Sequence, residues 1–561
     1  MFTDSKLHKA SLGHYPNQHM KDEVSPPTRA LIDRLYQPLT LRERLTGSGD
    51  YKAIFSKIAN SNEPAAIVDL FPFVLAKNTD VATAAADAIH KLFLALPTTD
   101  LASLEWILSN RAAYVTAELQ DWRQLNPSQL VQLDRFGDRS AQLLGLASFH
   151  SNGYVREAAI NRLALFDSGA ELLFLILRLN DWVPNVRDAA NNTIRARIRP
   201  EYCRRFIENF VLLSRVNQGK RADHTEIIQA INELVQSDPC RKVLLESLTS
   251  PDRFIRRACF RLALDSAHSD LQQVVTLALD DDDTVIRLFG AQKISSAFDE
   301  ATPEHFVDRM KRDRFMPVRR EALRIAVKHN SPHVVEELHT ALLHPHRSMR
   351  EEAVYHLKRS QSTNIAAFYR QHLAHAKGSA LYAVISGLGE TGGADDDSLI
   401  LPYASHQSSK IRRAALKALA AFRPEAHVEI FMNALQDEAR NVSRQALKVL
   451  SRKTALLSAA RVWELFSSAK HDHVKRNALS LIGNFSKWEG IAYLVRAVCD
   501  SDEDIVELSR WAIQRWFMRF NRNFTTPDAD QVARLQRALE SCGGRLDEAT
   551  QRQLWFSIKA E

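Results

Sequence analysis

Cysteine is scarce in this chain of 561 residues, and none of the five has a CxxC or other paired spacing (Cys203, Cys240, Cys259, Cys499 and Cys542). This pattern indicates reduced thiols in a cytosolic protein rather than a disulfide framework. No apolar run reaches the roughly 18 residues that a membrane-spanning helix needs. The first residues lack the apolar core of a secretory signal. We therefore expect a cytoplasmic protein without a membrane segment.

Recognisable catalytic and cofactor motifs are also missing. The chain has no GxxxxGK[ST] phosphate loop, no nucleophile elbow, no signature of a catalytic triad and no cofactor fingerprint. The glycines at 387, 389, 392 and 393 follow no predicted strand, so we interpret them as a helix C-cap and an inter-repeat turn. The aspartates at 280–283 lack the ligand spacing of a calcium loop, and we expect Asp283 to cap a helix. The sequence predicts no catalytic residue and no cofactor.

The net charge is modest for a chain of this length. The formal charge is +7 at pH 7 and the pI is about 9.0, while 25% of the residues are charged and 45% are apolar. Such an excess of basic residues permits binding to a polyanion without indicating it. Composition therefore provides ample residues for a core and leaves the function open.

The informative feature is an internal repeat. In residues 313–322, Asp313 precedes a helical pattern in which Val318 and Ala322 share one face. The anchor position of Val318 recurs, mostly at spacings of 31 or 32 residues, at Val81, Val155, Val186, Ile255, Ile286, Val318, Met349, Ala380, Ile411, Val442, Val474 and Ile505. Four residues later stand Ala85, Ala159, Ala190, Cys259, Gly290, Ala322, Ala353, Val384, Ala415, Ala446, Ala478 and Ser509. All but Val384 are small, which lets two helices approach closely. Self-similarity at this period predicts a solenoid.

Two further positions indicate the type of repeat. The residue five before the anchor is Asp at 181, 281, 313, 437 and 500, and the residue after it is Arg at 156, 187, 256, 287, 319, 350 and 412 and Lys at 475. An Asp in the turn followed six residues later by Arg resembles the HEAT repeat. The glycine-rich segment 387–392 resembles the bacterial HEAT-like repeats of the phycobilisome-lyase type. The resemblance covers roughly residues 65–520. It implies an all-α solenoid of stacked antiparallel helix pairs in a curved, elongated array, with an Asp–Arg ladder along the turns, and no particular function.

The repeat divides the chain into four predicted parts. Residues 1–30 form a polar tail that we expect to be disordered. Residues 31–150 form irregular helical repeats, with Trp106, Tyr114 and Trp122 in their core. Residues 151–520 form the regular solenoid, with an insertion near 200–250 where the polar stretch 214–224 favours a loop. Residues 521–561 form a helical cap over the last apolar face.

The exposed side of the second helix in each pair carries a charge pattern. Residues two and six after an anchor point away from the apolar stripe, to the side that lines the concave face of a HEAT array. At these positions nine residues form a basic column: Arg257, Arg261, Arg320, Arg324, Arg413, Lys417, Arg444, Lys448 and Arg476. Other repeats have acidic residues there, such as Glu157, Glu351 and Glu507. The column is a candidate site for an acidic protein surface or for nucleic-acid phosphates, and the alternative to both is a solvated helix face.

Three histidines, His344, His375 and His406, replace the turn aspartate at intervals of 31 residues. Successive repeats stack roughly 10 Å apart, whereas a metal–nitrogen bond is about 2.0–2.1 Å, so the three cannot share one ion. We expect no metal site.

These features together predict a non-catalytic scaffold in the cytoplasm of a bacterium. It binds a large, acidic protein partner across several repeats and needs no small-molecule cofactor. The alternative is a nucleic-acid-binding HEAT-like module, including one that resembles a DNA glycosylase, although no stretch of this sequence carries that family's functional residues.

Overall fold

The computed structural model describes residues 24–37, 51–97, 100–110, 125–216, 221–267, 270–297, 304–360, 364–522 and 524–559. Every regular element in these ranges is a helix, which confirms the predicted all-α fold. The chain divides into two compact units, Met1–Phe306 and Val307–Glu561. No helix in the described ranges is both long and apolar enough to span a membrane.

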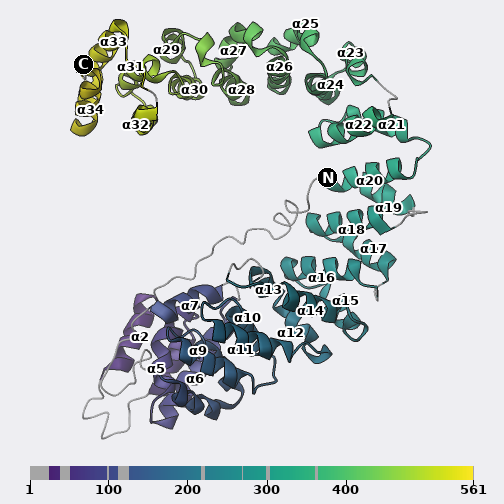
Figure 1. Cartoon of the computed structure of the whole chain (residues 1–561), viewed down its shortest axis with the longest axis vertical. Helices are drawn as coiled ribbons and strands as arrows, with labels where there is room; N and C mark the ends of the chain where they lie inside the picture. The colour runs from purple at the N-terminus through teal and green to yellow at the C-terminus, as the bar shows by residue number, and fades with distance from the viewer. Residues whose placement is uncertain are drawn as a thin grey trace. The chain divides into compact units, whose positions relative to one another are not determined.

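The first unit consists of helices that pack in successive pairs (Figure 1). They are α2 (Pro26–Tyr36), α4 (Tyr51–Ala59), α5 (Ile67–Val74), α6 (Thr79–Leu94), α7 (Leu101–Asn110), α8 (Ser140–Ala147), α9 (Gly153–Leu163), α10 (Leu172–Arg178), α11 (Pro184–Arg195), α12 (Cys203–Glu208), α13 (Phe210–Val216), α14 (Thr225–Gln236), α15 (Arg241–Ser247), α16 (Arg253–Asp265), α17 (Leu271–Asp280) and α18 (Thr284–Ala297). A long 3-10 segment, Pro127–Arg139, precedes α8.

The second unit continues the same arrangement, and α19 (Glu304–Lys311) spans the point of division. Its helices are α20 (Met316–Lys328), α21 (Val334–Leu342), α22 (Arg347–Ser360), α23 (Ile365–Leu373), α24 (Gly378–Thr391), α25 (Asp397–Ile400), α26 (Ser409–Phe422), α27 (Val428–Leu435), α28 (Arg440–Leu450), α29 (Ala459–Ser467), α30 (Asp472–Ile482), α31 (Lys487–Ala497), α32 (Glu503–Arg519), α33 (Ala529–Cys542) and α34 (Glu548–Lys559).

Two predicted segment boundaries meet helices. Residues 1–23 of the predicted tail lie outside the described ranges, but Pro26 already begins α2, in which Thr28 and Ile32 are buried. The polar stretch predicted as a loop begins inside α13, which ends at Val216, and residues 217–220 lie outside the described ranges.

One predicted core residue is wrong. Trp106 lies on α7 and is 59% exposed, because the inward face of this helix is formed by Leu104, Ile107 and Leu108. The other two aromatic residues of that prediction, Tyr114 and Trp122, lie outside the described ranges.

The repeat register is confirmed by burial. All twelve residues four positions after an anchor are buried, including Val384. Nine of the twelve anchors are buried as well, and Val81, Ile255 and Ala380 are half-buried. Each anchor and the residue four later form one stripe on the second helix of a pair, and this stripe packs on the first helix. Helices with so narrow an apolar stripe need this packing to be stable.

The predicted Asp–Arg ladder joins successive pairs. Arg156 donates from Nε and Nη2 to the two carboxylate oxygens of Asp181, 25 residues later, at 2.9 Å each. Its Nη1 donates to two carbonyl oxygens of its own turn, those of His150 and Ser151. The arrangement returns at Arg256 with Asp281 and at Arg412 with Asp437. Lys475 makes the shorter version with Asp500.

Histidine at the turn preserves one function of the aspartate and loses the other. The Nδ1 atoms of His344 and His406 accept the backbone N–H two residues later, at 3.0 Å, as the aspartate carboxylate does elsewhere. A neutral imidazole offers no carboxylate to the preceding arginine. The consequence appears at Arg319, 25 residues before His344, whose buried Nε has no hydrogen-bond partner in the described chain.

We predict that His344→Asp stabilises the second unit by about 1–2 kcal/mol, because the carboxylate gives Arg319 the partner that other ladder arginines have. Urea denaturation measures the gain. His406→Asp is the matched control: the residue 25 positions before it is Leu381, so the new carboxylate keeps the turn bond but finds no arginine. An equal gain in both variants would contradict the ladder explanation.

The gain should depend on pH. Burial and the charge of Arg319 lower the pKa of His344 below its usual value of about 6.5. The unfolded chain then binds more protons below this pH, so the wild-type contribution to stability falls as the pH falls. Replacing the histidine removes that loss. The advantage of the variant should therefore grow between pH 7 and pH 5.5.

The interpretation of the glycine-rich segment is wrong for two of its four glycines. Gly392 ends α24 and Gly393 follows it, as expected of a cap and turn. Gly387 and Gly389 lie inside the helix and allow close packing. A Cβ at 387 would lie 2.1 Å from the Tyr369 ring of α23, and one at 389 would lie 2.8 Å from the Cα of Ala418 in α26. Composition suggested a helix end where the structure has a close helix contact.

Gly389→Ala should destabilise the second unit by roughly 1–3 kcal/mol, because the clash is with backbone and cannot be relieved by rotating a side chain. Gly393→Ala is the control, since a Cβ there meets nothing within 4 Å. Thermal unfolding of the two variants checks this. Equal melting temperatures would show that α24 and α26 do not approach as described.

Candidate functional site

The second helices of successive pairs form one layer in the second unit. Figure 1 shows α26, α28 and α30 in a row, with α25, α27 and α29 in the other layer. Helix α26 packs on α24 and α28, and α28 packs on α30. Residues two and six after the anchors project from this layer on the side away from the buried stripe. The predicted basic column is therefore made of side chains from adjacent helices.

The two units divide the nine predicted residues. Arg257 and Arg261 belong to the first unit, and the other seven belong to the second. Arg257 is half-buried and forms a bidentate ion pair with Asp283 of the next pair, and Arg261 lies with its guanidinium 5.3 Å from the ring centre of Phe289. Asp283, predicted only to cap α18, also accepts from the N–H of Val285.

Three of the seven in the second unit also have acidic partners. Arg324 donates from Nε and Nη2 to the carboxylate of Glu352 and from Nη1 to the buried Glu321, each at 2.8–2.9 Å. Arg320 lies 3.9 Å from Glu352, and Arg476 pairs with Asp504 at 2.5 Å. Burial raises the pKa of Glu321, and the charges of the two arginines oppose this shift. These arginines join neighbouring helices.

The remaining four residues are Arg413 and Lys417 on α26 and Arg444 and Lys448 on α28. No ion pair or hydrogen bond of their side chains occurs within the described part of the chain. Lys417, Arg444 and Lys448 are exposed and Arg413 is half-buried.

Sequence reasoning missed two cations of the same surface. Arg440 begins α28 four residues before Arg444, and Arg452 follows the helix four residues after Lys448. Both are exposed and without a side-chain partner in the described ranges. The spacing of four residues was visible in the sequence, but only positions two and six after the anchor were considered. We call the six residues the cationic face: Arg413, Lys417, Arg440, Arg444, Lys448 and Arg452.

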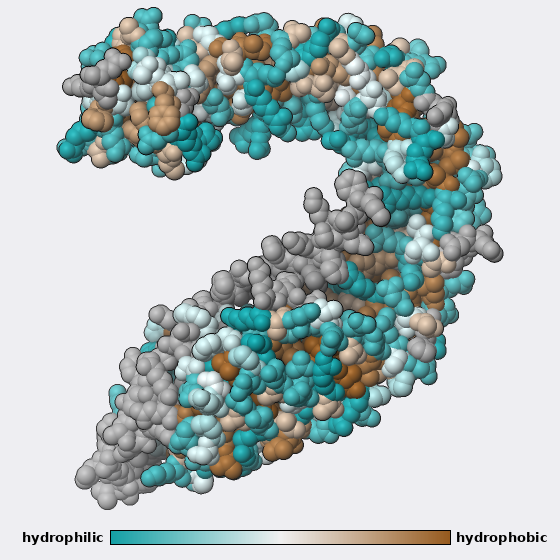
Figure 2. Space-filling view, in the orientation of Figure 1, coloured by the Kyte–Doolittle hydropathy of each residue, from teal (hydrophilic) through white to brown (hydrophobic). Residues whose placement is uncertain are grey.

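The cationic face is compact. Arg440 and Lys448 are eight residues apart on one helix, which corresponds to about 12 Å, and packed helices such as α26 and α28 lie about 8–10 Å apart. In Figure 2, hydrophilic surface covers the edge of the row at α26 and α28. Six like charges with no carboxylate among them create a positive potential that is attractive to an anionic partner.

Acidic residues bound this surface on both sides. The position two after the anchor is the exposed Glu351 on α22 and the exposed Glu507 on α32. Between them, α24 has Tyr382 there, and α30 has Arg476, which is already paired. The positive surface is therefore confined to two adjacent helices and does not continue along the layer.

The described residues contain no group of three or more His, Cys, Asp and Glu side chains that could hold a metal ion. The turn histidines are used locally, as described above.

Comparison with known proteins finds neither a matching family model nor a matching curated protein. Solved structures with similar helix stacking include importin beta (TM-score 0.31, 11% identity, covering 95% of this chain and 66% of that chain). They also include the Kap95:Nup1 complex (TM-score 0.33, 12% identity, 96% and 67%) and Kap121p (0.28, 12%, 100% and 69%). At superposition scores this low the likeness carries no information on function. The helix pairs and the ladder are of the HEAT type.

The paired and unpaired members of the predicted column should differ in stability. Arg324→Gln leaves the buried Glu321 and Glu352 without their cation and should cost roughly 1–2 kcal/mol. Arg444→Gln breaks no contact and should change the free energy of unfolding by less than about 0.5 kcal/mol. Chemical denaturation of the two single variants distinguishes them. A larger effect for Arg444 would mean that it has a structural role.

Proposed function

We propose that this protein is a non-catalytic, cytoplasmic binding scaffold and that its cationic face recognises an acidic segment of a protein partner. The observation that supports this most directly is the set of six cations on α26 and α28 without internal partners. Elsewhere in the layer the equivalent arginines have acidic partners within the chain. Cations left unpaired on adjacent helices are available to an external anion.

The compactness of the face favours a protein segment over a nucleic acid. A single-stranded nucleic acid is bound along a groove of positive charge that follows its backbone. Here Glu351 and Glu507 stand at the equivalent positions on either side, where they would repel phosphates. An acidic helix with carboxylates four residues apart places two charges about 6 Å apart. Several such charges fit on a face of about 10 by 12 Å. Recognition of this kind contributes to specificity and to the rate of association.

The test replaces four cations that have no structural role. In the variant Arg413→Glu, Lys417→Glu, Arg444→Glu and Lys448→Glu, we expect binding of a fluorescein-labelled decaglutamate peptide to fall at least tenfold, with an unchanged circular dichroism spectrum. Wild-type binding should weaken steeply between 50 and 300 mM salt. Fluorescence anisotropy measures both effects.

A matched control carries the same change of charge elsewhere in the second unit. Arg312, Arg314, Lys358 and Lys470 are exposed and have no side-chain partner in the described ranges. Their replacement by Glu should leave much of the peptide affinity in place. Equal losses in the two quadruple variants would show a general effect of net charge. If labelled single-stranded DNA or RNA binds more tightly than the peptide and loses affinity only in the first variant, the nucleic-acid alternative replaces the proposal.

A further inference from the structure

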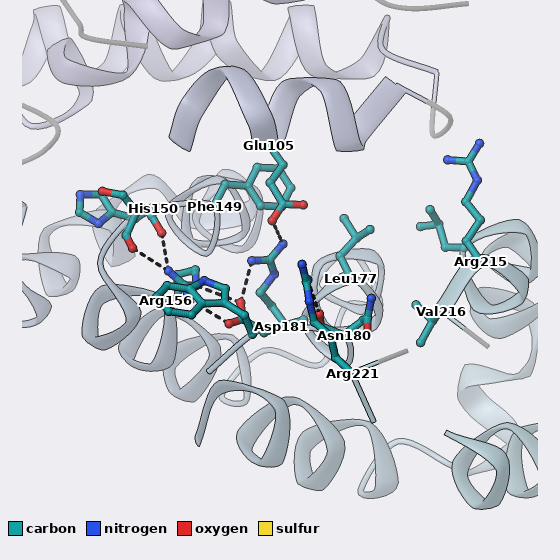
Figure 3. Close-up of a pocket in the computed structure, with 14 residues that line it drawn as sticks. Glu105, Phe149, His150, Arg156, Leu177, Asn180, Asp181, Arg215, Val216 and Arg221 are labelled. Carbon is teal, nitrogen blue, oxygen red and sulfur yellow. Dashed lines mark hydrogen bonds and ion pairs between the residues drawn. The ribbon is translucent and has the colours of Figure 1, made fainter. Parts of the chain in front are cut away.

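A pocket of about 300 Å³ lies in the first unit, separate from the cationic face. It is bordered by α7, the turn before α9, α10 with the turn that follows it, and α13. Its charged lining consists of four arginines and two carboxylates, Arg156, Arg178, Arg215, Arg221, Glu105 and Asp181. The formal charge of these six is +2, four positive less two negative. Figure 3 shows Glu105 reaching down from α7 toward the pocket, with Arg156 and Asp181 joined below it.

Asp181 is saturated and belongs to the ladder. It accepts two hydrogen bonds from Arg156, one from Arg178 Nη1 and one from the N–H of Val183, all at 2.9 Å. Burial alone would raise the pKa of this carboxyl, but the hydrogen bonds and the two arginine charges hold it below its usual value. Asp181 therefore remains an anion, and it fixes one end of Arg178 in place.

The other edge of Arg178 is incompletely occupied. The Nη2 atom donates to Glu105, whereas the buried Nε has no partner in the described chain. The side chain of Arg178 is only 5% exposed. Other arginines of this protein use the pair Nε and Nη2 to hold both oxygens of one carboxylate, as Arg156, Arg256 and Arg350 do. In Arg178 this two-point edge holds Glu105 through one point only.

Glu105 differs from the other carboxylates of the ladder. It comes from α7, 73 residues away in sequence, and its side chain is 30% exposed. Only one of its oxygens has a hydrogen bond among the described residues. A carboxylate that made both bonds to Arg178 would be held better than Glu105 is.

Apolar side chains complete the pocket. Phe149, Leu212 and Val216 are buried, Leu177 is half-buried, and Trp182 is 66% exposed at the margin. The guanidinium of Arg156 lies 5.3 Å from the ring centre of Trp182 and supports it. Figure 3 shows Leu177, Val216 and Arg215 on one side of the pocket and His150 on the other. A ligand here would contact cations and apolar surface together.

We propose that this pocket binds a carboxylate attached to an apolar group, and that the ligand carboxylate takes the Nε and Nη2 edge of Arg178 in place of Glu105. Arg221, exposed at the margin with its Nη1 on the carbonyl oxygen of Asn180, adds attraction. A monoanion fits better than a phosphate dianion, since Asp181 and Glu105 already place negative charge beside the ligand. The carboxylate comes from a free small acid or chain terminus, or from an acidic side chain of a peptide.

The experiment uses the full-length protein and isothermal titration calorimetry. N-acetylphenylalanine supplies a terminal carboxylate with an aromatic group, and N-acetyl-Asp-Phe-amide supplies a side-chain carboxylate. The uncharged N-acetylphenylalanine amide is the control ligand. We expect at least one carboxylate to bind ten times more tightly than the amide. The tighter of the two identifies the source. If neither carboxylate is preferred over the amide, the proposal is wrong.

Variants test the exchange with Glu105. Glu105→Gln removes the competing charge and should raise the affinity of the carboxylate at least threefold, a gain that a purely structural glutamate would not give. Glu226→Gln, which removes an exposed glutamate paired with Arg195 in the same unit, is the matched control and should change nothing. An affinity that stays the same or falls in Glu105→Gln overturns the exchange.

Loss of binding completes the test. Arg178→Lys keeps the charge but loses the two-point edge, so affinity should fall at least tenfold. Because Arg178 also contacts the buried Asp181, its folding is checked by circular dichroism. Arg221→Gln, at an exposed position, should reduce affinity severalfold with the fold intact. Wild-type affinity in Arg221→Gln together with wild-type affinity in a folded Arg178→Lys would exclude this pocket as the site.

Discussion

The guanidinium that follows each anchor sets the position of one helix pair relative to the next. Its Nη1 is held by carbonyl oxygens of its own turn, and its Nε and Nη2 are held by the aspartate of the following turn, as Arg412 is by His406, Gln407 and Asp437. Both ends are directional, so the arginine fixes distance and rotation together. An ion pair this deeply placed adds little net stability, because desolvation offsets attraction. Its contribution is to define one stacking geometry for surfaces that apolar packing alone would leave free to slide.

The same logic explains which cations are left for binding. In the layer of second helices, an arginine meets a neighbour when an acid stands about 26 to 28 residues later, as with Arg257 and Asp283 or Arg324 and Glu352. For Lys417 and Lys448 the residues 28 positions later are Gln445 and Arg476, which offer no carboxylate. The predicted column was thus two populations. Applying the repeat spacing to the acids, and not only to the cations, would have separated them from the sequence.

The fold was largely predictable because it depends on local periodicity. A small residue four after the anchor and an Asp–Arg pair 25 residues apart are properties of a single repeat and its neighbour, and both recur often enough to be recognised. The errors fall where the period gives no information. Gly387 and Gly389 were assigned to a helix end by composition, although their partners, Tyr369 and Ala418, lie on other helices. Trp106 was assigned to the core by residue type, although its helix lies outside the regular register.

The pocket was not predictable for the same reason. Its two carboxylates come from different sources: Asp181 is a ladder residue at a repeat position, whereas Glu105 lies on α7 and no period relates it to Arg178. Arg178 therefore holds a ladder carboxylate on one side and an irregular one on the other. The regular side uses its hydrogen-bonding capacity fully, and the irregular side leaves Nε unused. A repeat array satisfies its polar groups by repetition, so an unsatisfied buried donor marks a place where the repetition stops. At that place the geometry of the ladder itself, an arginine edge shaped to hold two carboxylate oxygens, becomes available to a ligand.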